Sequence, residues 1–152
     1  LDTSSIPDTD VISAAVFSVY GKGFVDDPSG TWYASVFASN HSDTVVGGDF
    51  DLGTTTDWSG DQAFENQSVS AYNDFTLNAT GIAGINVTGN TKLCMREVTY
   101  DIANVAPGNA AATSPNYQFA STATAGTTQD PKLVITHAAA GAVTNHPLLM
   151  GV

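Results

Sequence analysis

The sequence predicts an all-β fold: an antiparallel, jelly-roll-type β-sandwich with one short helical turn and an extended C-terminal tail. Six or seven segments rich in β-branched and aromatic residues recur along the chain, separated by turns rich in Gly, Pro, Asn and Asp. The composition is 42% hydrophobic and 12% charged, with two Trp, five Tyr and seven Phe to fill a core. A chain of 152 residues fits one domain. We expect the sandwich to span residues 1–137, followed by a spacer and apolar tail over 138–152.

The first half of the chain contains three predicted strands. Both alternating faces of the segment 11–20 are largely apolar, which is typical of a strand covered on two sides. The turn DDPSG at 26–30 combines a fixed proline φ with a permissive glycine, and a second strand is expected over 32–38. The Gly- and Asp-rich run 47–60 predicts an ordered loop with at most a short strand. Alternation over 68–77 predicts the third strand.

A single helical turn is expected after Asn78, because Ile82 and Ile85 lie three residues apart behind this potential N-cap. Strands are then expected over 92–100, 117–121 and 132–137, with turn-rich loops over 103–116 and 124–131. Cys94 lies in the first of these strands, and we interpret it as a small buried hydrophobe. As the single cysteine, it excludes an intramolecular disulfide.

The charge of the chain excludes two classes of partner. The formal net charge is -11, and the four basic residues are scattered, so no basic patch for a nucleic acid backbone can form. No apolar run approaches the ~20 residues that span a bilayer, and anionic lipid repels an acidic chain. We therefore expect neither nucleic acid binding nor membrane insertion. The low charge and the abundance of Ser, Thr, Asn and Gly are typical of β-rich extracellular proteins.

The tail from Ala138 onward departs from the strand pattern. A spacer of three Ala and one Gly precedes four large apolar residues, Leu148, Leu149, Met150 and Val152. Apolar side chains at a chain terminus need a cover, which either this molecule's own surface or a neighbouring molecule can supply. The sequence leaves both possibilities open.

Glycan attachment and glycan binding both have candidate residues. N-glycosylation sequons begin at Asn40, Asn66, Asn78 and Asn86, a modest excess over about two expected by chance, and all lie in or near predicted turns and strand ends. Trp32 and Trp58 are candidates for stacking on sugar rings. The alternative for both tryptophans is packing in the core or in an interface.

No catalytic or metal-binding motif is present. The chain contains no Gly-x-Ser-x-Gly, no His-Glu-x-x-His and no Gly-rich phosphate loop. The three histidines are far apart in sequence, which does not favour zinc. A group of aspartates offers oxygen donors for Ca²⁺ without EF-hand spacing, so solvated carboxylates and Asx turns are the preferred interpretation for Asp49, Asp51, Asp57 and Asp61. We expect no enzyme, no cofactor and no metal.

Three stretches carry a family resemblance: LDTSSIPDTDVISAAVFSVYG, YNDFTLNATGIAGINVTGNTKLCMREVTYDIAN and YQFASTATAGTTQDPKLVITH. Together they cover most of residues 1–137, and they resemble the DNRLRE-type jelly-roll module, which is similar to carbohydrate-binding modules and occurs in secreted microbial, phage and environmental proteins. In that family a further strand leads into the phrase that here reads DTSSIP, and the chain begins at Leu1 without it. The resemblance therefore implies a sandwich with an unpaired edge and a hydrophobic groove.

These observations lead to one expected function and one alternative. We expect a non-catalytic extracellular structural subunit that associates with copies of itself into a filament or surface assembly, with covalently attached or bound glycans. The residues Leu148–Val152 would add as a strand to a neighbour's sheet edge, a heterologous contact that repeats into a ring or an open helix. In the rival arrangement the tail folds back on its own domain. The alternative function is a carbohydrate-binding module of a secreted enzyme or adhesin.

Overall fold

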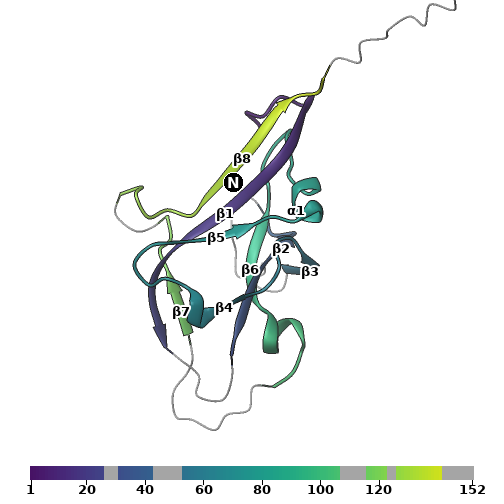
Figure 1. The fold of residues 1–152 in the computed structure, drawn as a ribbon. Coiled ribbons are helices and arrows are strands. Elements are labelled where there is room, and N and C mark those ends of the chain that lie inside the picture. The colour runs from purple at the N-terminus through teal and green to yellow at the C-terminus, as the bar shows by residue number, and fades with distance from the viewer. Residues whose placement is uncertain (26–30, 43–52, 107–115, 123–125, 142–152) are drawn as a thin grey trace, which may run out of the picture.

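The structure is a computed structural model, and it describes residues 1–25, 31–42, 53–106, 116–122 and 126–141 (Figure 1). Two antiparallel sheets and a few short helices make up the described chain, which confirms the predicted all-β sandwich; the jelly-roll connectivity stays a prediction. The strands are β1 (Asp10–Val25), β2 (Tyr33–Ser39), β3 (Gly53–Asp57), β4 (Gln62–Ala63), β5 (Tyr72–Thr76), β6 (Leu93–Glu97), β7 (Asn116–Phe119) and β8 (Lys132–Ala139). The helical turns are a 3-10 turn (Phe64–Asn66), α1 (Ala79–Ala83) and a π turn (Val98–Ile102).

The long strand β1 is the centre of the first sheet. β5 pairs with residues 16–20 of β1, and β8 pairs with residues 10–18. Because these registers overlap, β5 and β8 lie on opposite edges of β1. The remaining end of β1, from Gly21 to Val25, pairs with β7 after a bulge.

The strand β2 is the centre of the second sheet. Ala34 pairs with both β4 and β6, and Phe37 pairs with both β3 and β6, so β6 occupies one edge of β2 while β3 and β4 share the other. In the part of the chain that the structure describes, β6 and β8 each pair with a single strand along their length.

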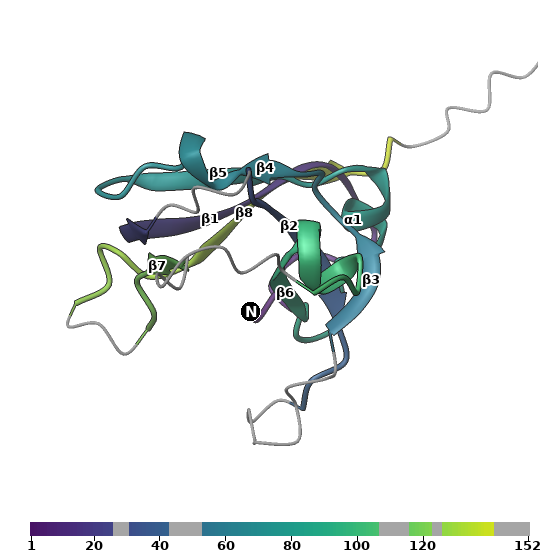
Figure 2. The same cartoon turned by 90° about the horizontal axis from the view of Figure 1, so that it is seen from below.

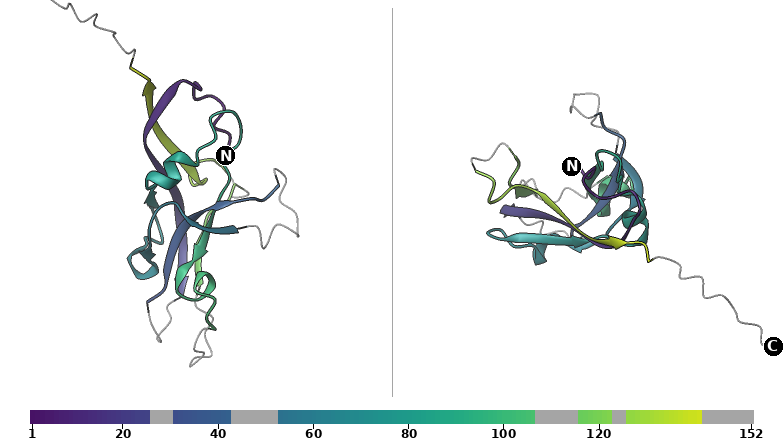
Figure 3. Two further views of the ribbon diagram at one scale, coloured as in Figure 1. Left: turned by 90° about the vertical axis from the view of Figure 1, so that its right-hand side faces the viewer. Right: turned by 90° about the horizontal axis from the view of Figure 1, so that it is seen from above.

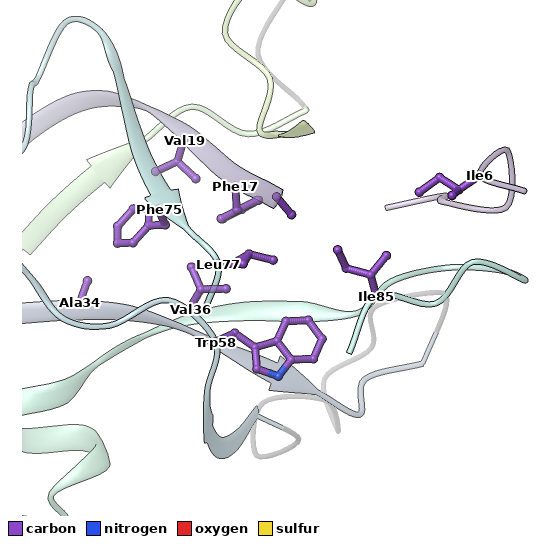
Figure 4. Close-up of a cluster of buried hydrophobic side chains, with 10 residues drawn as sticks. Ile6, Phe17, Val19, Ala34, Val36, Trp58, Phe75, Leu77 and Ile85 are labelled. Carbon is purple, nitrogen blue, oxygen red and sulfur yellow. The ribbon is translucent and has the colours of Figure 1, made fainter. Parts of the chain in front are cut away.

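Side chains from the inner faces of both sheets meet in one core (Figure 4). Phe75 and Val36 are fully buried at its centre. Trp58 is 5% exposed and packs so closely under α1 that a methyl group on Gly84 would collide with its indole ring. The buried cluster consists of Ile6, Ala15, Phe17, Val19, Ala34, Val36, Trp58, Phe75, Leu77 and Ile85. The prediction that Trp58 stacks on a sugar is therefore wrong, because its ring faces are covered by protein.

Several predicted segments agree with the structure in type. The short strand expected inside the run 47–60 is β3, although 47–52 and the predicted turn 26–30 lie outside the described residues. The predicted cap is also present, since Asn78 Oδ1 accepts a hydrogen bond from Gly81 N at 3.0 Å at the start of α1. β8 continues to Ala139, two residues into the predicted spacer, because Ala138 and Ala139 still pair with β1.

Two expectations need correction. β1 is covered on both faces only in its middle part, where the consecutive residues Phe17, Ser18 and Val19 are all buried; near its start Val11 is 58% exposed, and a register shift between Ile12 and Ala14 turns Ile12 toward the core instead. The strand predicted over 92–100 ends at Glu97. The Glu97 carboxylate accepts hydrogen bonds from the N–H groups of Thr99, Tyr100 and Asp101, and these bonds start the π turn.

Candidate functional site

The two sheets are joined along one side of the sandwich and diverge on the other (Figure 2). On the joined side, Gln62 Nε2 donates to Asp74 O at 2.8 Å and Asn78 N donates to Trp58 O at 2.7 Å. On the opposite side lie β6 and β8, and no further strand of the described chain bridges them. The sandwich therefore has one side that its described residues leave open.

Apolar side chains from both sheets are incompletely covered on this side. Leu93 and Met95 of β6, and Leu133 and Ile135 of β8, pack against the core cluster but remain only half-buried. Leu1 is 47% exposed beside them. We call these five residues the open edge. Inner faces of a sandwich normally cover each other, so the partial exposure of these side chains distinguishes this side from the closed part of the core.

The first residues of the chain form a short ladder immediately before β6. Leu1 and Thr91 exchange both backbone hydrogen bonds, at 3.1 Å and 2.8 Å, and Asp2 pairs with Asn90 in antiparallel sense. Thr3 N donates to Gly89 O at 3.1 Å, and the hydroxyls of Thr3 and Thr91 are 2.8 Å apart in a buried contact. The segment Leu1–Thr3 thus lies in the strand position next to β6, in what we call the row beside β6, and fills it only opposite residues 89–91.

Beyond Leu1, no described strand pairs with the backbone groups on this edge of β6. Ser39 N of β2 donates to Lys92 O at 3.2 Å, so Lys92 directs its backbone toward β2. Backbone groups alternate along an antiparallel strand, which directs the N–H and C=O of Leu93 and Met95 away from β2. Those groups lie on the same edge as the Leu1–Thr91 pair. Along Leu93–Glu97, the described chain contributes no strand to that edge. An edge of this kind is a template for strand addition.

Polar contacts hold the outer face of β6 in place. The Arg96 guanidinium forms two hydrogen bonds to Asp101, at 2.9 Å and 2.8 Å, and also donates to Gly53 O at 3.1 Å. Burial raises the pKa of the Cys94 thiol, which lies 3.8 Å from Ala38 O. β6 is therefore anchored to β2 and β3 while its other edge stays open.

The sequence alone did not identify Leu93 and Met95 as site residues. The signal was present as alternation, because apolar Leu93 and Met95 are separated by Cys94 and followed by Arg96. The four predicted tail residues, Leu148, Leu149, Met150 and Val152, lie outside the described residues.

The predicted glycan residues are placed as follows. The four sequon asparagines, Asn40, Asn66, Asn78 and Asn86, are all exposed, and their modification stays a prediction. Asn78 uses its side chain to cap α1, and Asn86 Oδ1 accepts hydrogen bonds from Thr88 N and Thr88 Oγ1. Trp32 is half-buried, with its ring 5.1 Å from that of Tyr100.

Asp57 has a structural role. Burial tends to raise the pKa of its carboxyl, but hydrogen bonds from the Ser35 hydroxyl and from the N–H groups of Gly60 and Ser59 outweigh burial and lower that pKa. These bonds form the expected Asx-type turn. Asp49 and Asp51 lie outside the described residues, and the described part of the chain has no group of three or more potential metal ligands. Its helices are all too short to cross a bilayer.

Comparisons with protein-family models, with curated proteins and with solved structures return no match to this chain. The similarity to DNRLRE-type modules therefore stays a prediction from the sequence.

Proposed function

We propose that the protein is a non-catalytic, extracellular structural subunit that assembles with copies of itself, and that an apolar tail from one copy completes the sandwich of the next. The open edge is the observation that carries this proposal. It combines incompletely covered apolar side chains with backbone groups that no strand of the described chain pairs, and an added strand would satisfy both features together.

The tail sequence has the pattern that such a strand needs. In an extended segment, Leu148, Met150 and Val152 fall on one face, and Leu149 falls on the other. Pro147 precedes them, and proline is tolerated as the first residue of a strand because no ladder hydrogen bond needs its missing N–H. Three apolar side chains on one face match the apolar inner face of the open edge.

The expected strength of this contact suits a repeating assembly. Full burial of each of the three side chains contributes about 1.5–3 kcal/mol, or roughly 5–9 kcal/mol together. Association costs on the order of 4–15 kcal/mol in lost freedom, so a single tail contact leaves little net affinity. A subunit inside the assembly donates one tail and accepts another, so it makes two such contacts. A subunit at the end of the assembly makes one contact and dissociates more readily.

Substitutions on the two faces of the tail test the proposal. Replacement of Leu148, Met150 and Val152 with Ser should yield folded monomers and no polymers, as seen by size-exclusion chromatography and electron microscopy. The matched control is Leu149→Ser, on the opposite face, which should still assemble. Deletion of Leu148–Val152 should act like the triple variant. Unchanged polymers after this deletion would contradict the proposal.

The alternative function makes a different prediction. A carbohydrate-binding module would stay monomeric and be retained on a polysaccharide, and Trp32→Ala would abolish that retention. Trp58→Ala cannot serve in this test, because Trp58 belongs to the core. A monomer that shows no retention on a broad panel of glycans would count against this alternative.

A further inference from the structure

We infer that the neighbour's tail is accepted by the free edge of β6, antiparallel to β6 and in line with Leu1–Thr3, so that subunits join head to tail into an open, polar filament. This inference rests on the proposed function, in which the tail of a second copy completes the sandwich. It adds the acceptor strand, the direction and the register.

The edge of β6 is favoured over that of β8 as the acceptor, because a short segment of the chain already pairs in the strand position next to β6. Leu1–Thr3 lies in this position beside residues 89–91, where Leu1 and Thr91 exchange both backbone hydrogen bonds and Thr3 N donates to Gly89 O, in antiparallel sense. Within the described chain, no segment lies in this row beside Leu93 and Met95, whose N–H and C=O groups face it. A strand that docks there extends an existing ladder and needs no new backbone geometry. β8 is next to no comparable segment in the described chain.

The direction of the added strand follows from that of Leu1–Thr3, which already pairs beside β6. Leu1–Thr3 runs antiparallel to residues 89–91, so a tail in the same row and direction enters beside Glu97 and ends beside Leu93. β1 ends and β2 begins at the same end of the molecule (Figure 1). Because β8 is antiparallel to β1, and β6 is antiparallel to β2, Ala139 leaves the domain at the opposite end from Glu97.

The exit of the chain from β8 therefore separates donor from acceptor. Figure 3 shows that the end of β8 leads away from the body of the sandwich. A subunit's own tail would have to reverse along the length of β6, about 17 Å for five residues, to enter beside Glu97. A neighbouring subunit placed beyond the Glu97 end of the sandwich sends its tail toward Glu97 already in the required direction. Repetition of this contact displaces each subunit along the strand direction, so the assembly stays open.

The register follows from side-chain faces. Leu1 fills the place opposite Thr91, and the inward-facing places beyond it lie opposite Leu93, Met95 and Glu97. Two of the three tail residues then meet apolar partners, with Val152 opposite Leu93 and Met150 opposite Met95. Leu148 lies opposite Glu97, whose carboxylate is taken up by the N–H groups that start the π turn. Gly151 then lies opposite Cys94, on the outer face.

Cross-linking to Cys94 tests this register directly. Cys94 and Gly151 would form a non-hydrogen-bonded pair, in which Cα atoms are about 4.5 Å apart, close enough for a disulfide. Cys94 is the single cysteine of the chain, so each cysteine added to the tail reports on one pair. Polymers of Gly151→Cys, Leu149→Cys and Met150→Cys would be treated with diamide at mildly alkaline pH, because burial raises the pKa of the Cys94 thiol.

Gly151→Cys should give a ladder of disulfide-linked oligomers on a non-reducing gel, joined between residues 94 and 151 as shown by mass spectrometry of the linked peptides. Met150→Cys, which faces inward, should cross-link roughly tenfold less. Adding Cys94→Ser to Gly151→Cys should remove the ladder. When that double variant is mixed with the parent chain, only mixed dimers should form, since the tail cysteine of one chain meets Cys94 of the other.

Other outcomes separate the two proposals. Preferential cross-linking of Leu149→Cys would overturn the antiparallel direction, because a parallel tail with Leu148 opposite Leu93 places residue 149 opposite Cys94. Polymers that depend on the tail but cross-link to Cys94 from no tail position would overturn the β6 acceptor and leave the proposed function intact. A disulfide within one chain would show that the tail folds back on its own domain, and would overturn both.

Discussion

Replacing both Leu93 and Met95 with Thr is expected to raise the critical concentration for assembly by up to about thirtyfold while the subunit stays folded. Each side chain is at most about a third exposed in the subunit and becomes fully buried when a tail docks. Full burial contributes about 1.5–3 kcal/mol, so docking recovers at most about 1 kcal/mol for each residue. Together they contribute at most about 2 kcal/mol, which corresponds to a factor of up to about 30 in the binding constant. Thr keeps the backbone groups and the β propensity of the strand.

The same double substitution also removes the part of each side chain that the subunit already buries. This loss is about 1–2 kcal/mol for each residue, against a total stability of about 5–15 kcal/mol, so urea unfolding should still show a folded domain. The critical concentration is measured as the protein left in the supernatant after polymers are sedimented. Cys94→Ser, on the outer face of the same strand, should change it less than about twofold. A double variant that assembles at the parent concentration would refute the assignment of Leu93 and Met95 to the contact.

Three further predictions concern the subunit itself. Trp58→Ala should lower the free energy of unfolding by about 3–5 kcal/mol, measured by far-ultraviolet circular dichroism in urea. Trp32→Ala, at a half-buried site, should lower it clearly less. Equal losses in the two variants would contradict the placement of Trp58 in the core. Gly84→Ala should cost about 1–3 kcal/mol, because the added methyl group collides with the Trp58 indole, and an unchanged urea midpoint would argue against this contact. The pKa of Asp57 in the folded state is lowered below its ordinary value of 3.8, so the Asp57 carboxylate contributes fully to folding stability at neutral pH and loses this contribution as the pH falls below that value. The stability of Asp57→Asn should therefore depend less on pH in this acid range than that of the parent chain. Parallel pH profiles of the two proteins would exclude this role.

The strands were largely predictable because their signals are local. The alternation in 11–20 and the β-branched and aromatic residues of 132–137 appear as β1 and β8, and Asn78 caps α1 as its side chain predicts. The ends of strands were less predictable, because distant contacts decide them. Gly21 does not end β1; a side chain there would collide with Ser68 and with the Tyr117 hydroxyl, which reaches across this position to Ser68 and Asn73.

The sequence alone was enough to propose the tail as one half of the contact, but it did not point to the acceptor half. Apolar residues near a chain end stand out in any sequence, because they need a cover. Leu93 and Met95 are ordinary residues of a predicted strand, and nothing local shows that one edge of that strand stays unpaired. That conclusion needed the pairing of Leu1 with Thr91 and of Ser39 with Lys92, which join segments far apart in the chain.

Amide hydrogen exchange along β6 compares polymers of the full chain with a chain truncated after Pro147. The N–H groups of Cys94 and Arg96 face β2 and serve as internal references, protected in both samples. The amides of Leu93 and Met95 face the free edge, and completion of the sandwich by a second copy predicts that they exchange rapidly in the truncated chain and at least about tenfold more slowly in polymers. Equal exchange of these two amides in both samples would contradict strand addition at β6.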